Sequence, residues 1–179
     1  MRDPIDRLLW EHQGIKRQIA DLRGAVLALA EQGDRALAGV RPVLQGTARM
    51  IDSELLAHAR REDEALFPVI ERALNEKALT GEMRQEHRDI HAEADLFRVT
   101  LRQLNEVEHP AIVAGGAQLG RLAGADAGAQ ALRAAGAELI RLLDEHFRKE
   151  EEILFPMARE VLDLAELEEI SRQMDALDA

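Results

Sequence analysis

The sequence repeats one segment, HARREDEALFP at residues 58–68 and HFRKEEEILFP at residues 146–156. Each copy places a glutamate four residues after a histidine and continues to Leu-Phe-Pro at the same offset. Four helical residues rotate about 400° and rise about 6 Å, so the histidine and the glutamate of each copy project side by side. Such a pair forms a clamp for a metal ion. Two copies in one chain therefore predict a metal site built from two related halves.

Four parts of the chain carry apolar residues at alternating steps of three and four, through residues 8–29, 44–69, 83–104 and 132–157. Stripes of this kind are typical of helices that share one core. Asp3 and Pro4 fit the cap and first residue of the first helix. We therefore predict an all-α fold, an antiparallel up-down-up-down four-helix bundle over about residues 3–160, within a single domain of residues 1–179. A short amphipathic helix over about residues 164–177 either caps the bundle or forms a dimer contact.

The links between the stripes differ in length. Those near residues 33–34 and 75–81 are short, which favours antiparallel neighbours. The segment 109–128 contains Pro110 and glycines at positions 116, 120, 124 and 128. It fits either close helix packing or a flexible insertion, and the charged residues within it favour the insertion.

Several histidines and glutamates occupy stripe positions where leucine or isoleucine is expected. A buried carboxylate without a partner costs several kcal/mol, and the stripes offer no Lys or Arg to neutralise one. Because the imidazoles converge with the carboxylates, a metal ion is the simplest counter-charge. The predicted metal ligands are His12, His58, Glu62, His87, His91, His146 and Glu150.

Other polar residues near these positions are assigned outside the site. Glu151 follows Glu150 directly but points about 100° away from the stripe. Glu11 points away from the stripe in the same manner, so we expect it to be exposed or at most to accept a bond from a ligand. His109 precedes a proline and fits no stripe, which suggests a solvent-exposed or capping histidine.

Composition limits the class of function. The net charge is −11, which disfavours nucleic acid and anionic membranes as partners. The chain has no cysteine, which excludes disulfides, thiolate metal sites and thiol catalysis. It also lacks a long apolar span or a signal core, so we expect a cytoplasmic protein. Imidazole and carboxylate ligands suit iron, manganese or zinc.

This pattern of ligands, with LFP after both clamps, resembles the hemerythrin-like, or HHE cation-binding, domain over about residues 3–160. The resemblance implies two iron ions bridged by Glu62, Glu150 and an oxo or hydroxo group. One iron would take His87, His91 and His146, and the other would take His12 and His58 and keep an open position. HxxxE occurs twice here, whereas oxygen-carrying hemerythrins place an aspartate five residues after one histidine. In this respect the chain is similar to bacterial members and to the di-iron domain of iron–sulfur cluster repair proteins.

Two classes of function remain open at this stage. The first is reversible binding of O2, NO or peroxide by a sensor or carrier, as a monomer or dimer. The second is an enzyme or iron donor in oxidative or nitrosative stress defence, or an iron store. The chain has no Tyr to form a radical and no Cys to relay electrons, which favours a binding protein over an enzyme.

Overall fold

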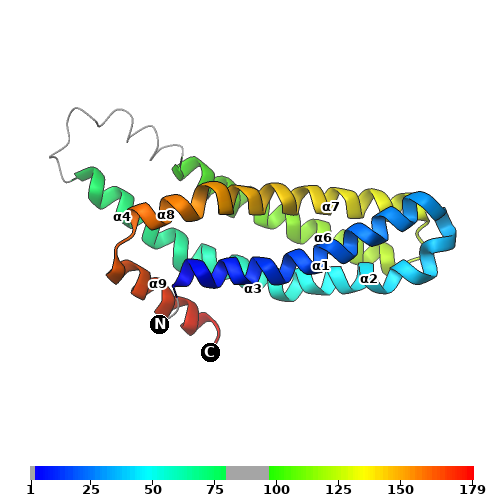
Figure 1. Cartoon of the computed structure of the whole chain (residues 1–179), viewed down its shortest axis with the longest axis horizontal. Coiled ribbons are helices and arrows are strands. Elements are labelled where there is room, and N and C mark those ends of the chain that lie inside the picture. The colour runs from blue at the N-terminus through cyan, green and yellow to red at the C-terminus, as the bar shows by residue number, and fades with distance from the viewer. Residues whose placement is uncertain (1–2, 80–96) are drawn as a thin grey trace.

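The computed structural model describes residues 3–79 and 97–179. Within these ranges the chain is helical and has no strand. This confirms the all-α prediction. Figure 1 shows long helical stretches lying side by side along one axis, with the shorter helix α9 (Leu164–Leu177) near one end.

The first stretch is α1 (Pro4–Gln32), and a 3-10 turn, η1 (Gly33–Ala36), follows it. The second stretch comprises α2 (Leu37–Met50), η2 (Ile51–Leu55), α3 (Leu56–Arg61), η3 (Glu62–Leu66) and α4 (Phe67–Leu79). The third comprises helical residues 97–103, η4 (Leu104–Glu108) and α6 (His109–Gly124). The fourth comprises α7 (Ala129–Lys149), η5 (Glu150–Leu154) and α8 (Phe155–Val161), and α9 (Leu164–Leu177) ends the chain.

The ends of α1 follow from local chemistry. The side chain of Asp3 accepts a hydrogen bond from the Ile5 amide at 2.8 Å, and Pro4 begins the helix. A carboxylate at this position satisfies amides that have no partner within the helix. Gly33 ends α1 with φ of 59°, a left-handed conformation that side chains other than glycine rarely adopt. The chain therefore turns where the sequence predicted a short link.

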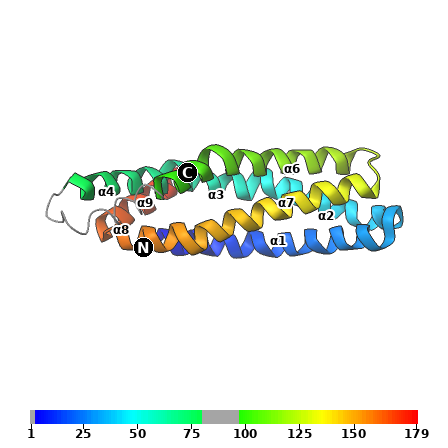
Figure 2. The same ribbon diagram turned by 90° about the horizontal axis from the view of Figure 1, so that it is seen from above.

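Each of the four stretches packs along two of the others, and α4 of the second stretch also contacts α8 of the fourth. Helix α1 packs against α2 and α7, and α6 packs against the same two helices. The turn at residues 33–36 and the link at residues 125–128 lie at the same end of the molecule in both views (Figures 1 and 2). The four stretches therefore enclose one interior.

The glycine-rich segment is helical, which overturns the predicted flexible insertion. Helix α6 covers most of it, and only residues 125–128 link α6 to α7. A Cβ atom built on Gly116 would lie 2.6 Å from Cγ2 of Ile51, and one on Gly120 would lie 3.0 Å from Cβ of Ala48. Hydrogen at these positions lets α6 approach the second stretch closely, so the alternative of close helix packing was the correct one.

The interior contains two apolar clusters separated by a polar layer. The larger cluster extends from Ile15 to Leu29 in α1 and joins buried residues of α2, α6 and α7. The smaller cluster joins Ile5 and Leu8 to buried residues of α4, α8 and α9. Every stretch passes from one cluster to the other through the polar layer, which consists of His12, His58, Glu62, His109, His146 and Glu150.

Short π-helical turns occur beside this layer. Two of them begin at Glu62 and Glu150, and a third ends immediately before His109. In each case a single residue separates the end of the turn from a proline. These prolines are, in the same order, Pro68, Pro156 and Pro110. Proline lacks an amide hydrogen and is tolerated where the helical hydrogen-bond ladder is already interrupted. The repeated Phe-Pro motif therefore marks a local change of helical pitch next to a polar side chain.

Helix α9 closes the end of the smaller cluster. The Asp163 side chain accepts from the Glu166 amide at 2.9 Å, and the Glu166 side chain accepts from the Asp163 amide at 2.7 Å. Ile170 and Met174 are fully buried in the smaller cluster. Of the two roles predicted for this helix, the structure supports the cap. In the described ranges, no helix has the length and apolar character needed to cross a membrane.

Candidate metal centre

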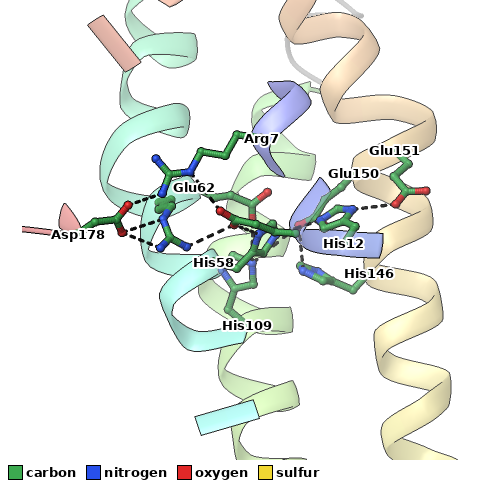
Figure 3. Close-up of polar contacts among 11 residues, drawn as sticks. Arg7, His12, His58, Glu62, His109, His146, Glu150, Glu151 and Asp178 are labelled. Atoms are coloured by element: carbon green, nitrogen blue, oxygen red, sulfur yellow. Dashed lines mark hydrogen bonds and ion pairs between the residues drawn. The ribbon is translucent and has the colours of Figure 1, made fainter. Parts of the chain in front are cut away.

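Six buried side chains meet at the centre of the polar layer (Figure 3). They form two groups, and within each group the potential ligand atoms all lie within 4.8 Å of one another. One group contains His12 and His58, the other contains His109 and His146, and both contain Glu62 and Glu150. All four helical stretches contribute, and the two glutamates lie between the histidine pairs.

All four histidines direct Nε2 toward the glutamates. In the first group, Nε2 of His12 lies 3.2 Å from Glu150, and Nε2 of His58 lies 3.5 Å from Glu62. In the second, Nε2 of His146 lies 2.9 Å from Glu150, and Nε2 of His109 lies 3.4 Å from Glu62.

The Nε2 atoms of His12 and His58 are 3.0 Å apart. Two nitrogen ligands at about 2.1 Å from one ion have about this separation. The first pair is therefore spaced as two ligands of a single ion.

The interior leaves several polar atoms unsatisfied. Both carboxylate oxygens of Glu62 and of Glu150, and Nε2 of His109 and of His146, are buried, and although these nitrogens lie near the oxygens, none of these contacts within the described residues has hydrogen-bond geometry. Such an atom costs about 1–3 kcal/mol, and more when it is charged. Because all six atoms face one small volume, cations placed there would satisfy them together. The residues present therefore fit a pair of metal ions.

The charges of the metal-free centre are strongly coupled. Burial alone would lower the pKa of His109, but Asp63, Glu150 and Glu62 outweigh it and raise this pKa to about 12. Burial also opposes the charged form of His146, whose pKa is nevertheless raised to about 9 by Glu150 and Glu108. The same histidines hold the pKa of Glu150 well below its usual value despite complete burial. Protons on His109 and His146 thus neutralise Glu150 when no metal is bound.

Phenylalanines of the repeated motif contact the histidines. The Phe155 ring lies 5.4 Å from the His12 ring, and the Phe67 ring stacks 6.3 Å from the His109 ring. Phe147, from α7, lies 4.4 Å from His12. These rings cover the polar centre on the side of each apolar cluster, which limits the access of water.

The structure brings together His12, His58, Glu62, His146 and Glu150, five of the predicted ligands. Glu150 faces the centre and Glu151 does not, as the spacing predicted. The other two predicted ligands, His87 and His91, lie outside the described residues.

The expectation for His109 was wrong. This histidine is 6% exposed, and its Nε2 lies in the second group. Counting helix length would have found it: from His146 back to the link at residues 125–128 is about 20 residues, and an equal length beyond the link ends near residue 109. Such a count requires the segment 109–128 to be helical, whereas its charged residues favoured an insertion.

Within the described residues the protein is helical, and its buried histidines and glutamates form two adjoining clusters. These features define a class, that of helical proteins with a candidate metal centre. The family model for the hemerythrin HHE cation binding domain matches residues 3–108 and 103–178. The chain therefore belongs to the hemerythrin family. Searches of curated proteins and of solved structures returned no match to this chain.

Proposed function

We propose that the two clusters hold a pair of iron ions. His12 and His58 would bind one ion, His109 and His146 would bind the other, and Glu62 and Glu150 would bridge them. The six buried atoms without a hydrogen bond are the observation that carries this proposal. Imidazole and carboxylate donors with open positions suit non-haem iron, and the family is one of cation-binding domains.

The proposed pair of ions differs from the sequence-based assignment in one respect. His109 takes the place given there to His87 and His91, so that each ion receives two imidazoles and a share of both carboxylates. We also propose that the whole chain is one domain and that its four stretches form an up-down-up-down bundle. This arrangement would bring the six side chains to one level.

The function that this centre supports best is reversible binding of a small ligand, O2, NO or peroxide, by a sensor or carrier. A bound pair of ferrous ions supplies electrons that can be shared with such a ligand and recovered. The chain itself supplies four donors to each ion, which leaves room for a further ligand. Apolar clusters on both sides and the Phe67, Phe147 and Phe155 rings exclude water from it.

Stopped-flow absorbance of the anaerobically loaded ferrous protein tests this function. We expect a new absorption band on mixing with O2, and we expect the band to disappear when the gas is removed. Irreversible oxidation in a single step would contradict reversible binding.

The likeness of the two clusters favours a second candidate function. Each cluster has two histidines and the same two glutamates, so neither ion is closed off by a third imidazole among the described residues. Open positions on both ions suit an enzyme that turns over peroxide or nitric oxide, and they also suit an iron donor or store. Repeated consumption of peroxide or NO in the same stopped-flow experiment would favour this alternative.

A further inference from the structure

The outward nitrogen of each central histidine faces a second carboxylate. Nδ1 of His12 lies 2.8 Å from Glu151, and Nδ1 of His58 lies 2.9 Å from Glu11. The corresponding distances are 3.1 Å from His109 to Asp63 and 3.3 Å from His146 to Glu108. None of these four acids lies in the two central groups.

These acids form a closed ring around the centre. Glu11, on the first stretch, contacts the histidine of the second, and Asp63, on the second, contacts that of the third. Glu108, on the third, contacts the histidine of the fourth, and Glu151, on the fourth, contacts that of the first. Every stretch therefore supplies one histidine and one acid that holds the histidine of the next stretch.

The ring follows from the position of each acid in the sequence. Every acid is the immediate neighbour of a central residue: Glu11 precedes His12, Asp63 follows Glu62, Glu108 precedes His109 and Glu151 follows Glu150. One helical residue rotates by about 100°. A side chain beside an inward-pointing residue is thus aimed at the adjacent stretch rather than at the centre or at solvent.

Three of the acids also form an ion pair with a Lys or Arg side chain. Arg61 lies 3.3 Å from Glu11, Lys16 lies 2.7 Å from Glu151, and Lys149 pairs with Glu108. Ionised carboxylates can only accept hydrogen bonds. Each histidine facing one must therefore donate from Nδ1.

We propose that Glu11, Asp63, Glu108 and Glu151 are positioning residues for the metal pair. By accepting the Nδ1 hydrogen, each acid leaves the lone pair of Nε2 free to bind an ion and fixes the plane of the ring. Glu11 and Glu151 serve the ion of His12 and His58, and Asp63 and Glu108 serve the ion of His109 and His146. This inference rests on the proposed metal centre.

The position of the histidine proton tests the proposal without any substitution. Zinc is a suitable probe because it is diamagnetic and because a nitrogen and oxygen site that binds ferrous iron generally binds zinc more tightly. In zinc-loaded protein labelled with 15N at histidine, long-range proton–nitrogen correlation spectra should show Nδ1–H and metal-bound Nε2 for all four histidines. Protons on Nε2 would overturn the proposal.

Substitutions then test the division between the two ions. Glu11→Leu should weaken the binding of the zinc ion at His12 and His58 by roughly 10–100-fold. Asp63→Leu should weaken the binding of the zinc ion at His109 and His146 by roughly the same factor. Glu11→Gln should restore part of the affinity, because the amide oxygen still accepts the Nδ1 hydrogen. The matched control is Glu64→Gln, at an exposed residue that pairs with Arg60, and it should bind both ions as wild type does.

The outcomes separate this inference from the proposal beneath it. Wild-type protein that bound no zinc would overturn the metal centre and the ring together. Two tightly bound ions in both leucine variants would overturn the ring alone. If a leucine variant does not fold, the proton positions in the wild-type protein still decide.

Discussion

Replacing His109 with alanine distinguishes the structure from the sequence-based assignment. If His109 is a ligand, the second cluster keeps only His146 and the two shared glutamates. We then expect the iron content of the loaded protein to fall by half. If His87 and His91 bind that ion instead, the substitution should leave the iron content unchanged.

The contacts of His109 set the expected loss of stability in the metal-free protein. The ring is nearly buried, with Nδ1 3.1 Å from Asp63 and Nε2 3.4 Å from Glu62. Removing one partner of a buried ion pair costs about 3–5 kcal/mol. Because the Asp63 side chain is 26% exposed and water can replace part of its contact, we expect a value near the lower end, about 3 kcal/mol.

The assay combines elemental analysis after anaerobic loading with urea unfolding of the metal-free protein. His109→Gln is the companion variant, because glutamine fills more of the space and can bond Asp63 but is a poor ligand for iron. It should lose the same ion at a smaller cost in stability. Full iron content in both variants, with loss in a His87→Ala/His91→Ala double variant, would refute the role of His109.

Three further substitutions or conditions test other parts of the structure. Gly116→Ala should destabilise the protein, because the clash with Ile51 costs about 1–3 kcal/mol and the gain in helix propensity is only about 1 kcal/mol. The control Gly24→Ala has nothing within 4 Å of the new Cβ and should stabilise the protein. Equal urea unfolding midpoints for the two variants would contradict the close packing. Glu62→Ala should lose one or both irons, and unchanged iron content on elemental analysis would exclude a bridging role. For the metal-free protein, the pKa of His146 is raised from 6.5 to about 9, so its stabilising contribution is complete below pH 6.5 and is lost as the pH rises to about 9. Urea midpoints should fall across that range, and a rise would contradict the charge assignment.

Much of the fold could be predicted from the sequence because helical periodicity is a local property. The stripes predicted the helices at residues 8–29, 44–69 and 132–157, whereas most of the 83–104 stripe lies outside the described residues. Asp3 and the link near residues 33–34 marked ends of the first helix that the structure confirms. There were two exceptions. Residues 75–79 continue α4 where a link was predicted, and the segment 109–128 is mostly helical although glycine lowers helix propensity. Its helical state depends on contacts with Ile51 and Ala48, which are distant in sequence. Tertiary packing of this kind cannot be read from a local pattern.

The candidate site was predicted only where its residues fall in a repeated motif. His58 with Glu62 and His146 with Glu150 share one spacing, and their burial follows from the stripe. His109 has no such partner on its own helix, so its place depends on the lengths of α6 and α7. The acids around the histidines were predicted only in part: Glu11 was expected to be exposed or at most to accept a bond from a ligand, and its side chain is 14% exposed and contacts His58.

The separation of the interior into two apolar clusters has a consequence for the way the protein melts. Among the residues that the structure describes, the layer between the clusters is ionic, and protons or metal ions neutralise its charges. Bound ions would tie the four stretches at mid-length, so both halves should unfold in one cooperative transition. When chelation removes the ions at a pH above about 9, His146 also loses its proton and the tie is weakened, so the two halves can unfold in separate transitions. The number of calorimetric transitions would then report metal occupancy.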